Sequence, residues 1–410
     1  MATILSLEIE CNVVVVSVLA WVDFGQQNQQ DMDRLLDSFR DESTVDELGI
    51  GTVRDAFSEM LYPGTSTLHT RARYLLFIAW QVTSVAARRH RLERALAELR
   101  REEVHLIEAL LAGDPNGGVI GRRARTKLKR MPSEVYWSAL GRYGIRRCGE
   151  GAQQHFRAIT ASSVAPSDEE DGTGHVHRDP HFAQLPQPPE HLAEEITFDL
   201  TADEAEFLSE RIQATCQGSY LAWLVRHRVP GDTAYAWDET LTVGLDDAPA
   251  RALGHARRLH HLYDGAPLLY NLLLARTVRW QEKVDEYEER LAEWSASEDV
   301  QIAATEWDRD DFWTCLLQQN QRIHAGTRDF VDQWVNLVRL DPGSSWQRPE
   351  AGQLVEGRER RLKKARSRFV DTEALHRWEG DSGLGGLSYR WPNARTLIND
   401  IHAGQGDRDA

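Results

Sequence analysis

The sequence predicts a mainly α-helical fold, and two patterns carry this prediction. Apolar residues recur every three or four positions over 89–112, which is the spacing of one buried helix face. Trp280, Val284, Tyr287, Leu291 and Trp294 recur at spacings of 4, 3, 4 and 3. This heptad-like seam predicts a long helix over 267–297 that packs against an antiparallel partner over 311–340.

The chain is long enough for more than one domain. Its 410 residues exceed the size at which one hydrophobic core usually stops growing. Residues 164–189 contain acids and prolines but almost no large aliphatic side chains, which predicts a flexible linker. We therefore expect an N-terminal helical domain over 16–163 and a C-terminal helical bundle over 190–403. A capping-box sequence at Thr201 marks the start of a helix in the second domain.

The first residues suggest two further expectations. A β-branched, apolar run favours a small strand near 13–22, with a counterpart around 196–200. Residues 1–15 are expected to be an over-extended gene start.

Composition limits the classes of partner. The chain has 64 acidic and 48 basic side chains and a formal charge of −16, which disfavours uniform attraction to nucleic acid or anionic membranes. Four isolated cysteines indicate neither a zinc site nor a disulfide framework. No apolar run reaches the length of a membrane-spanning helix, so we expect a cytoplasmic protein without a membrane partner.

Residues 46–80 hold the densest group of polar residues that could carry chemistry. Two tight turns could bring their acids and arginines into one pocket. Asp46, Glu47 and Asp55 are then candidate catalytic or metal-binding acids, and three arginines could bind an anion. These arginines are Arg54, Arg71 and Arg73. The alternative is a buried network of ion pairs and caps that only stabilises the turn.

A first basic segment covers 121–147, with nine positive residues and one acid. A helix through Arg130, a break at Pro132 and a second helix to Arg142 would have helix-turn-helix proportions. Its candidate phosphate contacts are Arg122, Arg123, Lys127, Lys129 and Arg130, and Tyr136 and Trp137 would lie near bases or backbone. The alternative is a solvated cationic face, or one that docks on the protein's own acids.

A second basic segment covers 358–368, with seven positive residues. Leu362, Ala365 and Phe369 share one helical face there, so we expect the charges to lie on the exposed remainder.

The sequence favours no cofactor and no metal. The spacing of His175, His177 and His181 suits metal ligands, but these residues fall in the predicted linker, where no rigid scaffold would hold them. No dinucleotide fingerprint, P-loop or nucleophile elbow occurs.

Several blocks together resemble a bacterial domain-of-unknown-function family over about 17–401. The most distinctive blocks are Asp46-Glu47-Leu48-Gly49-Ile50-Gly51, Pro63-Gly64-Thr65-Ser66-Thr67 and Thr70-Arg71-Ala72-Arg73-Tyr74. The resemblance brings no activity or catalytic residues. It implies a setting near phage-defence genes, with defence-system proteins as partners.

Taken together, the residues favour a non-enzymatic, nucleic-acid-associated accessory protein that binds DNA or RNA. One alternative is an enzyme that acts on a phosphate-containing ligand through the 46–73 block. A second alternative is a scaffold that binds protein partners through its tryptophan-rich C-terminal helices.

Overall fold

The computed structural model describes residues 46–147, 151–162, 181–189, 196–229, 232–305 and 307–406. The predicted mainly α fold is confirmed, since helices dominate these residues and no strand occurs among them. The strand expected around 196–200 is therefore wrong, and the one expected near 13–22 lies outside the described residues.

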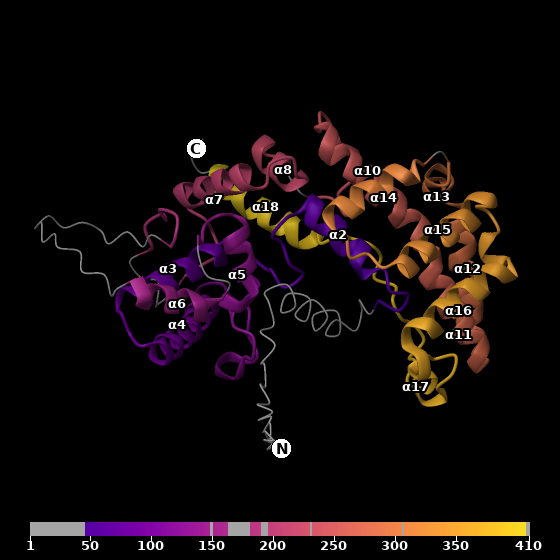
Figure 1. Ribbon diagram of the computed structural model, residues 1–410, viewed down its shortest axis with the longest axis horizontal. Helices are drawn as coiled ribbons and strands as arrows, with labels where there is room; N and C mark the ends of the chain where they lie inside the picture. The colour runs from indigo at the N-terminus through magenta and orange to yellow at the C-terminus, as the bar shows by residue number, and fades with distance from the viewer. Residues whose placement is uncertain are drawn as a thin grey trace, which may run out of the picture. The chain divides into compact units, whose positions relative to one another are not determined.

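The helices follow one another as in Figure 1. In the first half they are α2 (Gly51–Leu61), α3 (Tyr74–Ala87), α4 (Leu92–Gly113), η2 (Arg125–Lys127), α5 (Pro132–Arg142), α6 (Ala152–Ser162), α7 (Ala202–Thr215), α8 (Tyr220–His227) and α9 (Glu239–Thr242). In the second half they are α10 (Asp247–Tyr263), α11 (Gly265–Val278), α12 (Gln281–Ala296), α13 (Glu298–Ala303), α14 (Arg309–Gln319), α15 (Ala325–Leu340), η3 (Ser345–Gln347), α16 (Pro349–Lys363), η4 (Lys364–Arg366), α17 (Thr372–His376) and α18 (Trp391–Gly406).

Helix α3 lies at the centre of a group formed by α3, α4, α5 and α6, which we call the first group of helices. Its sequence is apolar on every side, and a helix of this kind is stable in water only when neighbours cover it all round. It packs against α4, α5 and α6, and the stripe predicted over 89–112 is the face that α4 turns toward the core.

The long helix predicted over 267–297 is in fact two helices. Arg279 adopts a left-handed conformation that ends α11, and the chain turns back so that α12 packs along α11. The predicted seam is still buried at Val284, Tyr287, Leu291 and Trp294, but the main partner of α12 is α11 rather than the 311–340 segment. A single left-handed residue decided this turn, and the periodicity of the flanking sequence does not reveal it.

Helices from the two predicted domains contact each other. Helix α2 of the first predicted domain packs against α10 and α14 of the second. Within the second, α18 lies along α7 and beside α8 (Figure 1). The described residues from 46 to 406 belong to one compact unit by their contacts. That residues 16–163 and 190–403 form separate domains stays a prediction.

The predicted linker is described only over its last part. Residues 164–180 lie outside the described residues, whereas 181–189 pack onto the first group of helices. Phe182 is buried, the backbone N–H of Ala183 donates to the carbonyl of Ile145 at 2.8 Å, and Trp80 donates its indole N–H to the carbonyl of Pro186 at 2.9 Å.

A buried ion pair joins α3 to α7. The guanidinium of Arg73, directly before α3, donates to Glu204 Oε1 at 2.8 Å and to the carbonyl of Thr197 at 2.9 Å. Glu204 also closes the capping box with Thr201 that the sequence predicts. The carboxylate therefore holds both the start of α7 and its position against α3.

Replacing Arg73 by methionine should destabilise the protein by about 3–5 kcal/mol, because it leaves the Glu204 carboxylate buried without a cation. The free energy of unfolding, measured by urea denaturation, checks this. The matched control is Arg276→Met, which breaks the half-exposed pair with Glu288 and should cost less than about 1 kcal/mol. Equal losses in the two variants would contradict the assignment.

Candidate functional site

The turn before α2 is built by Asp46. Its carboxylate accepts the backbone N–H groups of Ile50, at 2.9 Å, and of Gly51, and so satisfies two donors at the open end of the helix. Gly49 has a φ of +68°, which disfavours other residues, and a Cβ on Gly51 would lie 2.8 Å from Asp46 Oδ2. The two glycines are thus required by the turn itself.

Glu47 is buried beside the C-terminal part of the chain. Its carboxylate contacts the Lys363 ammonium, accepts a hydrogen bond from Arg368 Nη1 at 2.6 Å and accepts the hydroxyl of Ser382. Both oxygens are therefore engaged, and Glu47 acts in this structure as the centre of a buried polar cluster.

Arg358 clamps the same turn from α16. Its guanidinium donates to the carbonyls of Leu48 at 2.8 Å, Gly49 at 2.9 Å and Gly326 at 2.8 Å, and to the hydroxyl of Thr327 at 3.0 Å. A buried cation needs such acceptors to replace the water that it has lost.

The prediction for the second basic segment is therefore wrong in part. Arg358, Lys363 and Arg368 point inward, while Leu362, expected on the buried face, is 41% exposed. Arg361, Lys364 and Arg366 are exposed. The carbonyls of Leu48 and Gly49 accept from Arg358, and the Glu47 carboxylate pairs with Lys363 and Arg368. The periodicity of the segment gives no sign of these acceptors.

The predicted convergence of the 46–73 block fails for two of its arginines. Arg71 pairs with Asp400 of α18 at 3.0 Å, and Arg73 pairs with Glu204. Both guanidinium groups hold helices together and lie outside the cavity described below.

Asp55 and Arg54 lie on α2 next to the turn. Arg54 Nε lies 3.4 Å from Asp55 Oδ1, and Asp55 also lies 3.9 Å from a guanidinium nitrogen of Arg390. Asp55 does not line the cavity, whereas Arg54 does.

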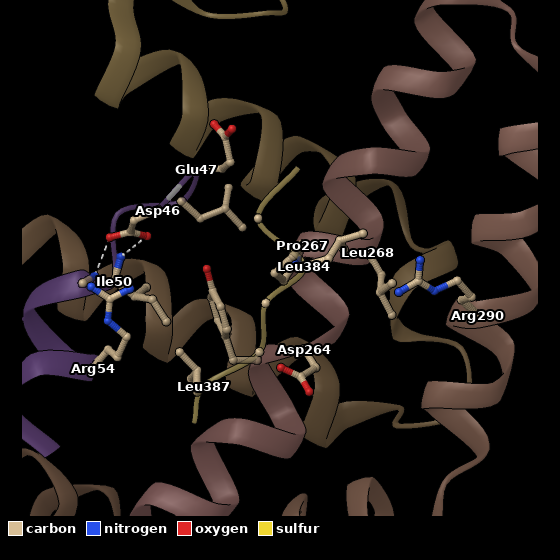
Figure 2. Close-up of a pocket in the computed structure, with 16 residues that line it drawn as sticks. Asp46, Glu47, Ile50, Arg54, Asp264, Pro267, Leu268, Arg290, Leu384 and Leu387 are labelled. Carbon is tan, nitrogen blue, oxygen red and sulfur yellow. Dashed lines mark hydrogen bonds between the residues drawn. The ribbon is translucent and has the colours of Figure 1, made fainter. Parts of the chain in front are cut away.

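A cavity of about 150 Å³ lies between the turn and the second half of the chain (Figure 2). Asp46, Glu47 and Arg54 reach it from the predicted block, and Tyr263 and Asp264 reach it from the junction of α10 and α11. The loop 383–387 forms one wall of the cavity.

Asp264 has an altered proton affinity in this cavity. Desolvation raises the pKa of the Asp264 carboxyl from 3.8 to about 7. Among the described residues the basic group within 4 Å of it is His260 Nε2, at 3.5 Å, and burial lowers the pKa of His260 to about 3, so that this imidazole is neutral near pH 7. The carboxylate thus has no cation as a partner among the described residues.

In the first basic segment the predicted second helix, which ends at Arg142, is present as α5, but a loop takes the place of the first, so no helix-turn-helix forms. Between α4 and α5 the described chain contains only turns and the short helix η2, so the predicted helix through Arg130 is absent. Arg100 of α4 donates to the carbonyls of Thr126 at 3.2 Å and Leu128 at 2.8 Å, and these bonds hold the loop in its irregular path. We call residues 121–130 the basic loop.

The cations of the basic loop face the solvent. Its five exposed cations form no ion pair with any described residue, and Arg130 is half-buried. The exposed residues are Arg122, Arg123, Arg125, Lys127 and Lys129.

Tyr136 and Trp137 are not available beside these cations. Tyr136 is fully buried, and its hydroxyl accepts the backbone N–H of Thr70 at 2.8 Å and donates to the carbonyl of Arg71 at 2.9 Å. Trp137 is buried as well. The predicted contact of these rings with bases does not fit this structure, because both stabilise the packing of α5.

A protein-family model matches most of the chain. The family model described as "Family of unknown function (DUF6361)" matches residues 16–404. The chain belongs to this family. The match confirms the resemblance expected over about 17–401, and DUF6361 carries no described activity. Neither the curated proteins nor the solved structures give a match.

No helix in the described part of the chain is long and apolar enough to cross a membrane. Over the same residues, no group of three or more His, Cys, Asp or Glu side chains is arranged to hold a metal ion.

Sequence reasoning missed Tyr263 and Asp264. They adjoin His260 and His261, and no spacing rule connects them to Asp46 more than 200 residues earlier. Only the packing of α2 against α10 brings them to one cavity.

The raised pKa of Asp264 makes stability depend on pH in a defined direction. Between about pH 4 and pH 7 the folded protein keeps a proton that the unfolded chain has released, so the free energy of unfolding falls as pH rises through this window. The substitution Asp264→Asn removes this titrating group and with it this part of the pH dependence of the free energy of unfolding. Its stability relative to the unsubstituted protein should increase from about pH 4 to pH 7 and then remain constant. Urea denaturation at several pH values measures the difference, and a difference independent of pH would contradict the assignment.

Proposed function

We propose that this protein binds nucleic acid through the phosphate backbone, and that the basic loop makes the contacts. The observation that supports this is the set of five exposed cations without an ion pair among the described residues, carried on a loop whose backbone is held by Arg100. A cation that pairs with a carboxylate must give up that ion pair to bind a phosphate, which weakens its binding. These cations have no such partner among the described residues. A fixed loop also loses little conformational entropy on binding.

The mode of binding that fits these residues is independent of base sequence. Lysine and arginine neutralise phosphates and release counterions, which gives affinity without base recognition. The aromatic side chains that would stack on bases are buried in α5. The net charge of −16 opposes binding elsewhere on the surface, so that contact with a polyanion should be confined to the loop.

The two other functions receive less support. An enzyme that clamps a phosphate through Arg71 and Arg73 would need both arginines at the cavity, and both are engaged in ion pairs elsewhere. A scaffold that binds partners through the tryptophans of the C-terminal helices receives limited support, because Trp294 and Trp334 are buried and Trp280 is 39% exposed. An accessory role in a bacterial defence system, with defence proteins as partners, stays a prediction from the family resemblance.

Fluorescence anisotropy with labelled duplex DNA, single-stranded DNA and RNA tests the proposal. Binding should weaken steeply as salt rises, with a slope of about −0.9 per phosphate contact for duplex DNA in a plot of log K against log salt. The triple variant Arg122→Glu, Arg123→Glu, Lys127→Glu should bind about tenfold more weakly or worse, and its salt slope should be smaller by about two to three.

The chain offers a control with the same change of charge. The triple variant Arg361→Glu, Lys364→Glu, Arg366→Glu also reverses two arginines and one lysine, all exposed, after the start of α16. It should retain most of the affinity and the salt slope. Equal losses in the two variants would mean that net charge alone matters, and no binding of any of the three nucleic acids at low salt would refute the proposal.

A further inference from the structure

The junction of α10 and α11 exposes two unsatisfied polar groups to the cavity. Tyr263 is only 7% exposed and lines the cavity, yet its hydroxyl makes no hydrogen bond with any described residue. Asp264 follows it directly and lines the same cavity, with neutral His260 as its nearest basic neighbour at 3.5 Å. The Asp264 side chain is 32% exposed, so the carboxylate and the phenol are both open to a molecule that enters the cavity.

The other charged groups around the cavity already have partners. Asp46 accepts two backbone N–H groups, and the oxygens of Glu47 are engaged by Lys363, Arg368 and Ser382. Of the three acids that line the cavity, Asp264 is the one whose carboxylate has neither a cation nor a backbone N–H as a partner among the described residues.

The two arginines that line the cavity are also paired. Arg54 contacts Asp55 at 3.4 Å, and Arg290 contacts Glu286 at 3.4 Å while its guanidinium lies over the ring of Tyr287. Their charges are directed to these carboxylates and do not compensate Asp264.

The remaining walls of the cavity are apolar. Leu268 of α11 and Leu384 and Leu387 of the 383–387 loop line it together with Ile50 and Pro267 (Figure 2). A space of about 150 Å³ with one carboxylate that lacks a cation, one phenol and several aliphatic side chains suits a short chain with a hydrogen-bond donor at one end. No group of side chains suited to a metal ion occurs in the described residues, which favours an organic cation over a metal.

We propose that this cavity binds a small aliphatic ammonium compound. The ammonium group donates to the Asp264 carboxylate and to the Tyr263 hydroxyl, and the aliphatic part lies against Leu268, Leu384 and Leu387. The site is separate from the basic loop and does not depend on nucleic-acid binding. A cationic ligand supplies the positive charge that the Asp264 carboxylate lacks as a partner, and charge-assisted hydrogen bonds of this kind are among the stronger ones in proteins.

Isothermal titration calorimetry with the full chain tests the site, with n-butylammonium as the probe. At about pH 8 the Asp264 carboxyl is ionised, and n-butylammonium should bind about tenfold or more tightly than n-butanol, which has the same chain without the charge. Butyrate, which carries the opposite charge, should not bind. At about pH 5.5 the carboxyl is protonated and the affinity for n-butylammonium should fall.

Three variants separate the site from general effects on folding. Asp264→Asn should weaken binding by about tenfold or more and remove its pH dependence, and Tyr263→Phe, which removes one oxygen atom, should weaken it by a smaller factor. Asp329→Asn, an exposed position on α15, is the matched control and should bind as the unsubstituted protein does. Thermal unfolding of each variant shows that it is folded.

Three results would overturn the proposal. The first is equal affinity for n-butylammonium and n-butanol. The second is unchanged binding of n-butylammonium by folded Asp264→Asn. The third is no heat of binding and no shift of the melting temperature with millimolar n-butylammonium at about pH 8.

Discussion

The surroundings of the cavity depend on the buried guanidinium of Arg358. It has no carboxylate partner among the described residues, and its charge is balanced by three backbone carbonyls and one hydroxyl. A cation removed from water is tolerated only when its donors find acceptors of this kind. Because the carbonyls belong to the turn before α2 and to the first turn of α15, one side chain of α16 joins three segments that are far apart in the sequence. The position of Asp46 and Glu47 follows from this clamp.

The cavity also depends on a close approach of two helices. Trp294 of α12 donates its indole N–H to the carbonyl of His261 at 2.8 Å, and its ring lies so near Gly265 that a Cβ there would be 2.4 Å from it. Glycine at the start of α11 therefore allows α12 to pack against the α10–α11 junction. This packing determines where Asp264, the residue before Gly265, meets the cavity.

Cations of the same chemical type have opposite roles in this molecule. Arg73, Arg358 and Arg368 are held by carbonyl or carboxylate oxygens of distant segments, so they stabilise the fold. The cations of the basic loop have no ion-pair partner in the described part of the chain and remain available to an anion from outside. The difference lies in what the neighbouring elements offer and not in the residues themselves.

The sequence by itself determined the helical class, the buried stripe of α4, the buried seam of α12 and the capping box of α7, because these depend on residues within a few turns of one another. It also determined that Asp46, Gly49 and Gly51 form a tight turn, which is a local property of the backbone. It did not determine the break at Arg279, the loop at 121–130 or the inward course of the α16 cations, since each depends on a conformation or an acceptor supplied elsewhere. Only the tertiary structure placed Arg71 beside Asp400 and brought Asp264 to the turn at Asp46, because hydrogen bonds and packing across hundreds of residues leave no periodic signal in the chain.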